Sequence, residues 1–198
     1  SVSRFSLTTL ERASDSPEGT QITISGGKML EVKAAGTSPG TTVEVRQLFF
    51  NLPARRKFLR TEETESAHIQ HYLTLAALAF PEVAFSFQKD GRLVWQLPAV
   101  KTGGGIPARL AALRERLRAL YGREQRLLAV NFFAEIPAAQ GAGEEEGAPA
   151  SNGFQLWGFM GVAGVSRSTR EDQHLFVNRR PVENRGLNFA LLEGYHTA

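Results

Sequence analysis

Residues that could contact phosphate gather in one stretch of this sequence, residues 40–60. Gly40 permits an unusual backbone angle, or a close approach by a ligand, at the start of a predicted strand, and Thr41 and Thr42 offer hydroxyls beside it. An aromatic pair, a turn and three cations in a row follow them: Phe49, Phe50, Asn51, Pro53, Arg55, Arg56 and Lys57. Taken alone, this pattern also fits a basic surface loop of any globular domain.

No other motif for catalysis or metal binding is complete. The Gly-Gly-Lys at residues 26–28 resembles the end of a phosphate-binding P-loop, but Ile22 and Met29 stand where a glycine and a hydroxyl are needed. His68 and His71 are spaced like a metal pair on a helix, but no third ligand can be assigned. The chain has no cysteine, no Gly-x-Ser-x-Gly elbow and no His-Glu-x-x-His helix. We therefore expect neither a metal site nor a catalytic centre within these residues.

The composition predicts a soluble globular protein without a membrane segment. Hydrophobic residues make up 42% of the chain, and no apolar run approaches the ~18 residues of a membrane span. The net charge of +3 comes from 23 basic and 20 acidic residues, which by itself is a weak argument for nucleic-acid binding. Basic residues cluster at 46–60 and 109–126. The chain starts without methionine and ends after a helix-like segment, so we expect a piece of a longer protein.

Hydrophobic periodicity predicts strands and helices in mixed order, which is typical of the α+β class. Strands are expected at residues 5–10, 20–25, 28–33, 41–47, 83–88, 92–97, 127–136, 154–162 and 173–177. Helices are expected from Pro53, from Glu62 to the stop at Pro81, from Pro107 to Gly122, and over 184–195. The expected apolar stripe of the second helix is Ile69, Tyr72, Leu73, Ala76 and Phe80, and that of the third is Leu110, Leu113, Leu117 and Leu120.

A glycine-rich run at residues 101–106 predicts a linker between two domains, 1–100 and 107–198. Residues 138–152, rich in Ala, Gly and Glu, predict a mobile loop in the second domain.

The hairpin across Lys89-Asp90-Gly91 allows two registers. A two-residue loop pairs Phe87 with Val94, whereas a three-residue loop pairs Phe87 with Leu93, Phe85 with Trp95 and Val83 with Leu97. Apolar matching favours the three-residue loop.

Residues 40–59 as a whole resemble the last nucleotide-site motif of MutL-type DNA mismatch repair proteins, which belong to the GHKL class of ATPases. The motif reads Gly-Thr-Thr-Val-Glu-Val at 40–45 and Leu-Phe-Phe-Asn-Leu-Pro-Ala-Arg-Arg-Lys-Phe-Leu at 48–59. In that family the Gly-Thr pair lies against the nucleotide, so the resemblance assigns nucleotide binding to Gly40 and Thr41.

A second resemblance to the same family lies in Leu-Phe-Val-Asn-Arg-Arg-Pro-Val at 175–182 and Leu-Asn-Phe-Ala at 187–190. Arg180 matches the arginine of the family's Val-Asn-x-Arg segment, and Arg185 falls on a commonly basic position. Arg179 departs from the pattern, because this position is often glycine. Residues 138–152 match nothing recognisable in the family.

The resemblance implies the remainder of a GHKL ATPase sandwich, a mixed sheet with helices, followed by a ribosomal-protein-like α+β domain truncated at its C-terminus. The implied parent couples ATP and Mg²⁺ to mismatch-repair signalling as a cytoplasmic, bacterial-type homodimer that binds DNA and other repair proteins. The family's water-activating Glu, magnesium-binding Asn and phosphate lid are not found in these residues, so we expect the chain to hold one edge of an ATP site without hydrolysing ATP or retaining Mg²⁺.

Sequence-independent DNA contacts are expected from the exposed cations, since phosphate contacts need only positive charge and some order. The candidate residues are Arg55, Arg56, Lys57, Arg179, Arg180 and Arg185. The arginines between 114 and 126 are a further cluster. Alternatives are another GHKL protein, such as a type II topoisomerase subunit, or an interaction scaffold that forms dimers independently of nucleotide and DNA.

Overall fold

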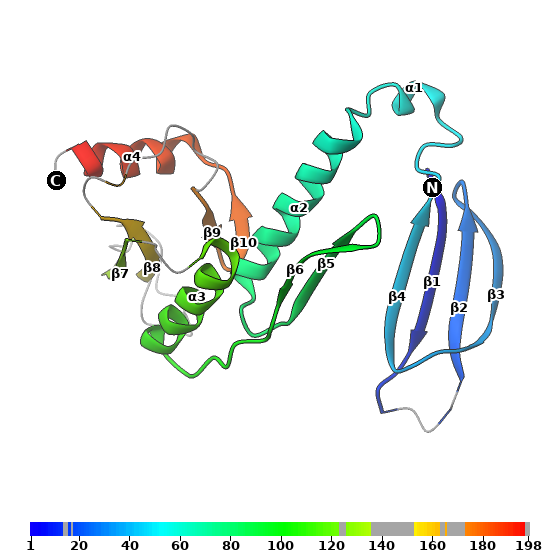
Figure 1. The fold of residues 1–198 in the computed structure, drawn as a ribbon, viewed down its shortest axis with the longest axis horizontal. Coiled ribbons are helices and arrows are strands. Elements are labelled where there is room, and N and C mark those ends of the chain that lie inside the picture. Colours follow the sequence, from blue (N-terminus) through cyan, green and yellow to red (C-terminus); the bar gives the residue numbers. More distant parts are fainter. Residues whose placement is uncertain are drawn as a thin grey trace, which may run out of the picture. The chain divides into compact units, whose positions relative to one another are not determined.

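The computed structural model describes residues 1–13, 16, 18–122, 126–135, 153–162, 165 and 173–196, and the chain forms two compact units (Figure 1). Unit 1 is Ser1–Ser66 and unit 2 is Ala67–Ala198. The mixed helices and strands confirm the α+β class. The expected division into domains 1–100 and 107–198 stays a prediction, because compactness does not identify family domains. The mobile-loop prediction for 138–152 lies outside the described residues.

Unit 1 contains one antiparallel sheet. Its strands are β1 (Arg4–Leu10), β2 (Glu18–Ser25), β3 (Lys28–Gly36) and β4 (Gly40–Arg46), in the order β3-β2-β1-β4. All four strands were expected, with ends that differ by a few residues. Gly26 and Gly27 join β2 to β3 with φ of 58° and 91°, so the predicted Gly-Gly hairpin is confirmed.

The two faces of this sheet differ in chemistry because side chains alternate along each strand. On one face, Phe5 lies opposite Ile24 and Val45, and Leu7 lies opposite Ile22 and Val43. Val43 and Val45 are more than half exposed. No apolar side chain of the described part of unit 1 is fully buried, so this face is an exposed apolar sheet surface.

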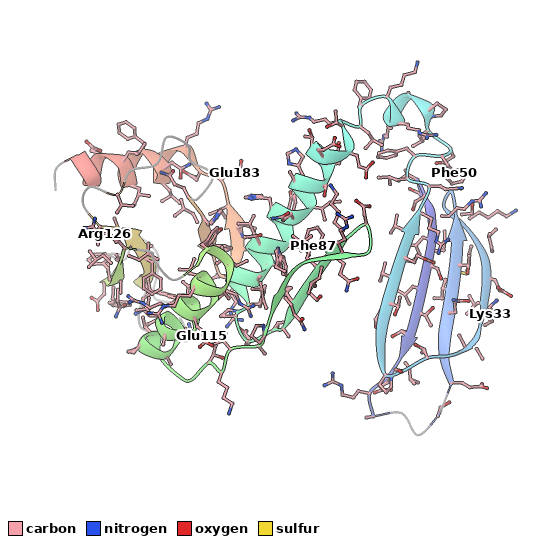
Figure 2. All side chains as sticks on the ribbon, viewed as in Figure 1. Lys33, Phe50, Phe87, Glu115, Arg126 and Glu183 are labelled. Atoms are coloured by element: carbon pink, nitrogen blue, oxygen red, sulfur yellow. The ribbon has the colours of Figure 1, made fainter. Side chains whose placement is uncertain are left out.

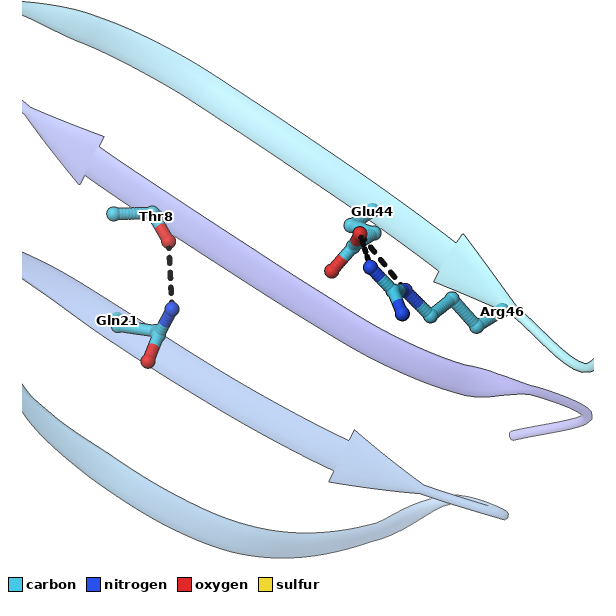
Figure 3. A network of polar contacts seen from close by, with 4 residues as sticks. All are labelled: Thr8, Gln21, Glu44 and Arg46. Carbon is cyan, nitrogen blue, oxygen red and sulfur yellow. Dashed lines mark hydrogen bonds and ion pairs between the residues drawn. The ribbon is translucent and has the colours of Figure 1, made fainter. Parts of the chain in front are cut away.

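The opposite face is polar (Figure 3). Gln21 donates a hydrogen bond to Thr8 across β1 and β2, with 3.1 Å between Nε2 and Oγ1. Arg46 pairs with Glu44 two residues earlier on β4, with 2.6 Å between Nη2 and Oε1. The pair is exposed, so it contributes little to stability.

Unit 2 contains most of the long helix α2 (Glu62–Ala79) and the hairpin of β5 (Phe85–Lys89) and β6 (Arg92–Leu97). Helix α2 begins at Glu62, as predicted from the acidic residues Glu62, Glu63 and Glu65 in its first turn. Thr61 caps the helix by accepting a hydrogen bond from the Thr64 amide. The expected apolar stripe was wrong at three of its five positions. Ile69, Tyr72 and Phe80 are exposed, whereas Leu73 and Ala76 are half-buried. The buried residues of the helix are Leu75, Ala77 and Leu78, which lie in its last turns.

The β5–β6 hairpin corrects the expected register. Lys89 pairs with Arg92, so the loop has two residues, Asp90 and Gly91, both with positive φ as a type I′ turn requires. A bulge between Phe87 and Gln88 then shifts the pairing. As a result Phe87 lies opposite Trp95 and Phe85 lies opposite Leu97, pairs that neither expected register contained. The bulge keeps the favourable turn and still matches large apolar side chains across the strands.

The rest of unit 2 comprises α3 (Ile106–Tyr121), β7 (Leu127–Glu135), β8 (Gly153–Gly161), β9 (Leu175–Val177), β10 (Arg180–Val182) and α4 (Arg185–His196). Strand β10 was not expected, since Pro181 removes a backbone donor and obscured a short edge strand. It pairs with β9 through a two-residue turn, Asn178-Arg179. Helix α3 packs on β6 and β8, and its four expected leucines are half-buried.

The centre of the buried face of α3 is occupied by a charged residue. Arg116 is 1% exposed and lies one turn after the buried Ala112. Its Nη2 donates to the carbonyl oxygens of Pro81 and Val83, at 2.7 Å each. The connector between α2 and β5 is therefore fixed to α3 by a buried guanidinium group.

Candidate functional sites

The predicted nucleotide-binding residues Gly40 and Thr41 lie at the start of β4, an edge strand of the unit 1 sheet. Gly40 has φ of 136°, a backbone angle that side-chain-bearing residues rarely adopt, and a Cβ there would meet no other atom within 4 Å. Its exposed backbone is thus open to close approach.

Thr9 on β1 completes this edge and was not identified from the sequence. Its hydroxyl lies 2.8 Å from the Thr41 hydroxyl and donates to the Gly40 carbonyl oxygen at 3.2 Å. Thr9 and Thr41 are directly opposite in the β1–β4 register, on the same side of the sheet as the apolar face. A hydrophobic pattern could not single out Thr9, because its role depends on which strand pairs with β1.

The motif that follows β4 is anchored to the beginning of the chain. The Phe49 amide donates to the Val2 carbonyl oxygen at 2.6 Å, and Asn51 Nδ2 donates to the Ser1 carbonyl oxygen at 3.2 Å. Phe50 lies beside the strand ends (Figure 2), and the Arg4 guanidinium lies 5.8 Å from the centre of its ring. These contacts fix where the chain leaves the sheet.

The cations Arg55, Arg56 and Lys57 follow at this exit. Pro53 begins the short helix α1 (Pro53–Arg56), and Lys57 caps it. All three cationic residues are exposed, and none has a side-chain hydrogen bond or ion pair within the described residues. They form a local basic patch that solvent or a polyanion can reach.

A second group of predicted cations lies around the β9–β10 turn of unit 2. Asn178 and Arg179 have φ of 49° and 66°, so Arg179 occupies a left-handed position that favours glycine. Arg180 begins β10 and Arg185 begins α4; both are exposed, and neither has a side-chain partner in the part of the chain that the structure describes. Asn184 caps α4 by accepting a hydrogen bond from the Leu187 amide at 3.0 Å.

Arg179 differs from its neighbours because it already has an anionic partner. Its Nη1 forms an ion pair with Glu82 Oε1, and its guanidinium lies 5.2 Å from the centre of the Phe80 ring. Burial raises the pKa of Glu82, but the hydrogen bonds from its own backbone amide and Arg179, with the charges of Arg179 and Arg109, lower the pKa below its ordinary value overall. No sequence pattern predicted a role for Glu82.

The basic cluster within 109–126 is not a common cationic surface. Arg116 is buried, and desolvation lowers its pKa although the charges of Glu115 and Glu82 act in the opposite direction. The Arg114 guanidinium lies 4.8 Å from the centre of the Phe159 ring on β8. The expectation that this cluster contacts DNA was therefore wrong for Arg116, which no phosphate can reach.

The His71 ring lies near the His174 ring. The rings of His71 and His174 are 5.8 Å apart, and the Tyr121 hydroxyl lies 3.2 Å from His174 Nε2. Within the described ranges, no three His, Cys, Asp or Glu residues are grouped as metal ligands. No described helix is long and apolar enough to cross a membrane.

Comparison with solved structures defines the class of protein to which this fold corresponds. The Aquifex aeolicus MutL ATPase domain complexed with ADP matches 97% of this chain and 63% of that chain, with 28% identity and a TM-score of 0.65. The N-terminal domain of a DNA repair protein matches 99% of this chain and 56% of that one, with a TM-score of 0.79; at 19% identity this similarity supports the fold alone. The fold is that of MutL-type, GHKL ATPase domains.

Curated relatives specify the family. The DNA mismatch repair protein MutL of Opitutus terrae is 39% identical over 196 residues, and that of Akkermansia muciniphila is 40% identical over 195. These matches cover 99% and 98% of this chain but 27% of each relative, so the chain spans about a quarter of their length. A family model described as DNA mismatch repair protein, C-terminal domain, matches residues 141–198. Over the segment that it spans, the chain belongs to the MutL family of DNA mismatch repair proteins.

The family match also corrects the expectation about residues 138–152. The family model begins at residue 141, and the Opitutus terrae relative aligns with almost the whole chain. This stretch therefore does not lie outside the similarity to the family.

Proposed function

We propose that this chain is the part of a MutL-type mismatch repair protein that supplies one edge of an ATP site and a DNA-contacting surface. The observation that carries the proposal is the 39% identity over 196 residues with a curated MutL protein. The parent protein would couple ATP and Mg²⁺ to repair signalling as a cytoplasmic homodimer that works with mismatch-recognition and downstream repair proteins. The named relatives favour this function over that of a topoisomerase subunit.

The nucleotide edge in this proposal consists of Gly40 and Thr41, with Thr9 behind them. Support comes from the open backbone at Gly40, the pair of hydroxyls, and the similarity to an ATPase domain that was solved with ADP. Thr41 would contact the nucleotide, and Thr9 would hold the Thr41 hydroxyl in place across the strands.

The DNA surface in this proposal is two separate groups of residues, one in each unit. The first is Arg55, Arg56 and Lys57 in unit 1, and the second is Arg180 and Arg185 in unit 2, with Arg179 as a conditional member of the second group because it is already paired with Glu82. Exposed guanidinium and ammonium groups bind phosphates without reading sequence. We expect affinity to fall as salt increases: the logarithm of the binding constant, plotted against the logarithm of the salt concentration, should have a slope of about −0.9 for each phosphate that is neutralised.

Fluorescence anisotropy of a labelled duplex, titrated with the chain at several salt concentrations, tests the DNA surface. The Arg180→Glu/Arg185→Glu variant should bind more weakly and with a shallower salt slope, by about one unit for each lost contact. Arg92→Glu/Lys101→Glu, which makes an equal charge change at residues outside the proposed groups, is the matched control. Equal losses in both variants would show a general charge effect, and absence of binding by the folded wild-type chain at low salt would refute the DNA surface.

A further inference from the structure

The turn between β9 and β10 presents a cation that is held by an acidic residue from a distant part of unit 2. Arg179 is 97 residues from Glu82 in sequence, yet the two form an ion pair. The Arg179 side chain retains 48% exposure, so a ligand in solution can reach it without unfolding of the turn. Its neighbours Arg180 and Arg185 are exposed and have no such partner among the described residues.

Glu82 is held in position by contacts on both sides of it in the chain. Arg116 donates to the carbonyl oxygens of Pro81 and Val83, the residues directly before and after Glu82. The Val100 amide also donates to the Pro81 carbonyl oxygen, at 2.9 Å. Because Arg116 is fully buried, this clamp is shielded from solvent and keeps the connector backbone in place. The backbone that carries the Glu82 side chain is therefore held in place on both sides.

The Arg179 side chain has contacts of two kinds that restrain it. Glu82 Oε1 takes its charge-assisted hydrogen bond, and the Phe80 ring, just before the connector, lies under the guanidinium at 5.2 Å. The second oxygen of Glu82, Oε2, is buried and has no hydrogen-bond partner in the described part of the chain. Arg179 is therefore paired through Oε1 alone, and a phosphate oxygen would have to replace that one interaction.

We propose that Glu82 competes with phosphate for the Arg179 guanidinium. The ion pair with Glu82 makes Arg179 less available to a polyanion and so limits the strength of polyanion binding at the β9–β10 turn. A DNA phosphate, like a carboxylate, accepts charge-assisted hydrogen bonds from a guanidinium group, and it can accept two at once. Binding through Arg179 therefore replaces an existing ion pair, whereas binding through Arg180 or Arg185 does not. This inference rests on the proposed DNA surface and assigns a restraining role to a residue outside it.

The test compares duplex binding by the wild-type chain, Glu82→Gln, Arg179→Gln and the double variant at several salt concentrations. Glu82→Gln keeps the shape of the side chain and removes its charge, so Arg179 becomes available to phosphate. We expect tighter binding at low salt, by about two- to fivefold for one exposed pair, and a salt slope steeper by about one unit. Arg179→Gln should have a small effect in the wild-type chain and should abolish the gain in the Glu82→Gln chain.

Glu183→Gln is the matched control for net charge. Glu183 is exposed between β10 and α4, so its loss changes the charge of the same region equally (Figure 2). Its effect should not depend on Arg179. Equal gains in Glu82→Gln and Glu183→Gln, both unchanged by Arg179→Gln, would overturn the inference while leaving the DNA surface intact. Absence of duplex binding by every folded variant, Glu82→Gln included, would overturn both.

Discussion

The nucleotide edge of unit 1 and the cationic turn of unit 2 are positioned in different ways. Gly40, Thr41 and Thr9 are neighbours in one regular sheet, and strand register alone places their polar atoms together. At the cationic turn, Arg179 is placed by a local hairpin, but its interactions are decided by Glu82 and Phe80. Position at a surface and availability to a ligand are therefore separate properties, and the second depends on tertiary contacts.

The two units are also stabilised in different ways. All fully buried apolar side chains of the described residues lie in unit 2, together with the buried guanidinium of Arg116. Unit 1 has strand pairing and half-buried side chains instead. Changes to single side chains should therefore matter most in unit 2, whereas backbone conformation should matter most in unit 1.

The largest effect is expected for Arg116→Met. The change removes two charge-assisted hydrogen bonds and leaves the Val83 carbonyl oxygen without that donor, which should lower the free energy of unfolding by about 2–3 kcal/mol. Urea unfolding followed by tryptophan fluorescence reports on unit 2, because Trp95 and Trp157 both lie there. Arg118→Met, at an exposed position of the same helix, should change stability by less than about 0.5 kcal/mol. Equal unfolding midpoints would show that the clamp contributes little.

An intermediate effect is expected for Gly40→Ala in unit 1. The positive φ of Gly40 should make alanine cost about 1–3 kcal/mol although its Cβ meets no other atom. Hydrogen exchange of β1 and β4 amides measures the local loss, which tryptophan fluorescence cannot report. Gly36→Ala is the control, because its Cβ also meets no atom within 4 Å and its φ is not positive. Similar exchange in both variants would contradict the backbone explanation.

A smaller effect is expected for the hydroxyl pair behind Gly40. A double-mutant cycle of Thr9→Val and Thr41→Val should give a coupling energy of about 0.2–1 kcal/mol, the range for cross-strand pairs. The cycle of Thr9→Val with Thr20→Val is the comparison, since Thr20 is also directly opposite Thr9 but shares no hydroxyl hydrogen bond with it. The same coupling in both cycles would mean that strand contact, rather than the hydroxyl pair, links the residues.

The smallest effect is expected in the pH dependence of unit 2. Because the pKa of Glu82 is lowered on folding, its contribution to stability is present above its ordinary pKa of 4.5 and is lost as the pH falls through the folded value. Between pH 6 and pH 3 the wild-type chain should therefore lose more stability than Glu82→Gln. Urea unfolding at each pH checks this, with Glu183→Gln as the control, and parallel losses in wild type and Glu82→Gln would contradict it.

The sequence by itself determined the elements whose causes are local. Alternating apolar residues, the Gly26-Gly27 turn, and the proline at the start of α1 depend on short-range sterics and on period-two or helical patterns. The residues at 40–59 and 175–190 also identified the family, which the comparisons confirmed. Both motifs can be recognised from the order of their residues alone, because no contact between the residues is needed to identify them.

Only the tertiary structure decided what depends on distant residues. The β5–β6 bulge balances a favourable turn against apolar pairing, and the burial of α2 depends on what covers its last turns. Thr9, Glu82 and Arg116 look like ordinary surface residues in sequence, because a polar side chain gives no local signal of its partner. Their partners lie 31 to 97 residues away, and only folding brings the two groups within hydrogen-bonding distance.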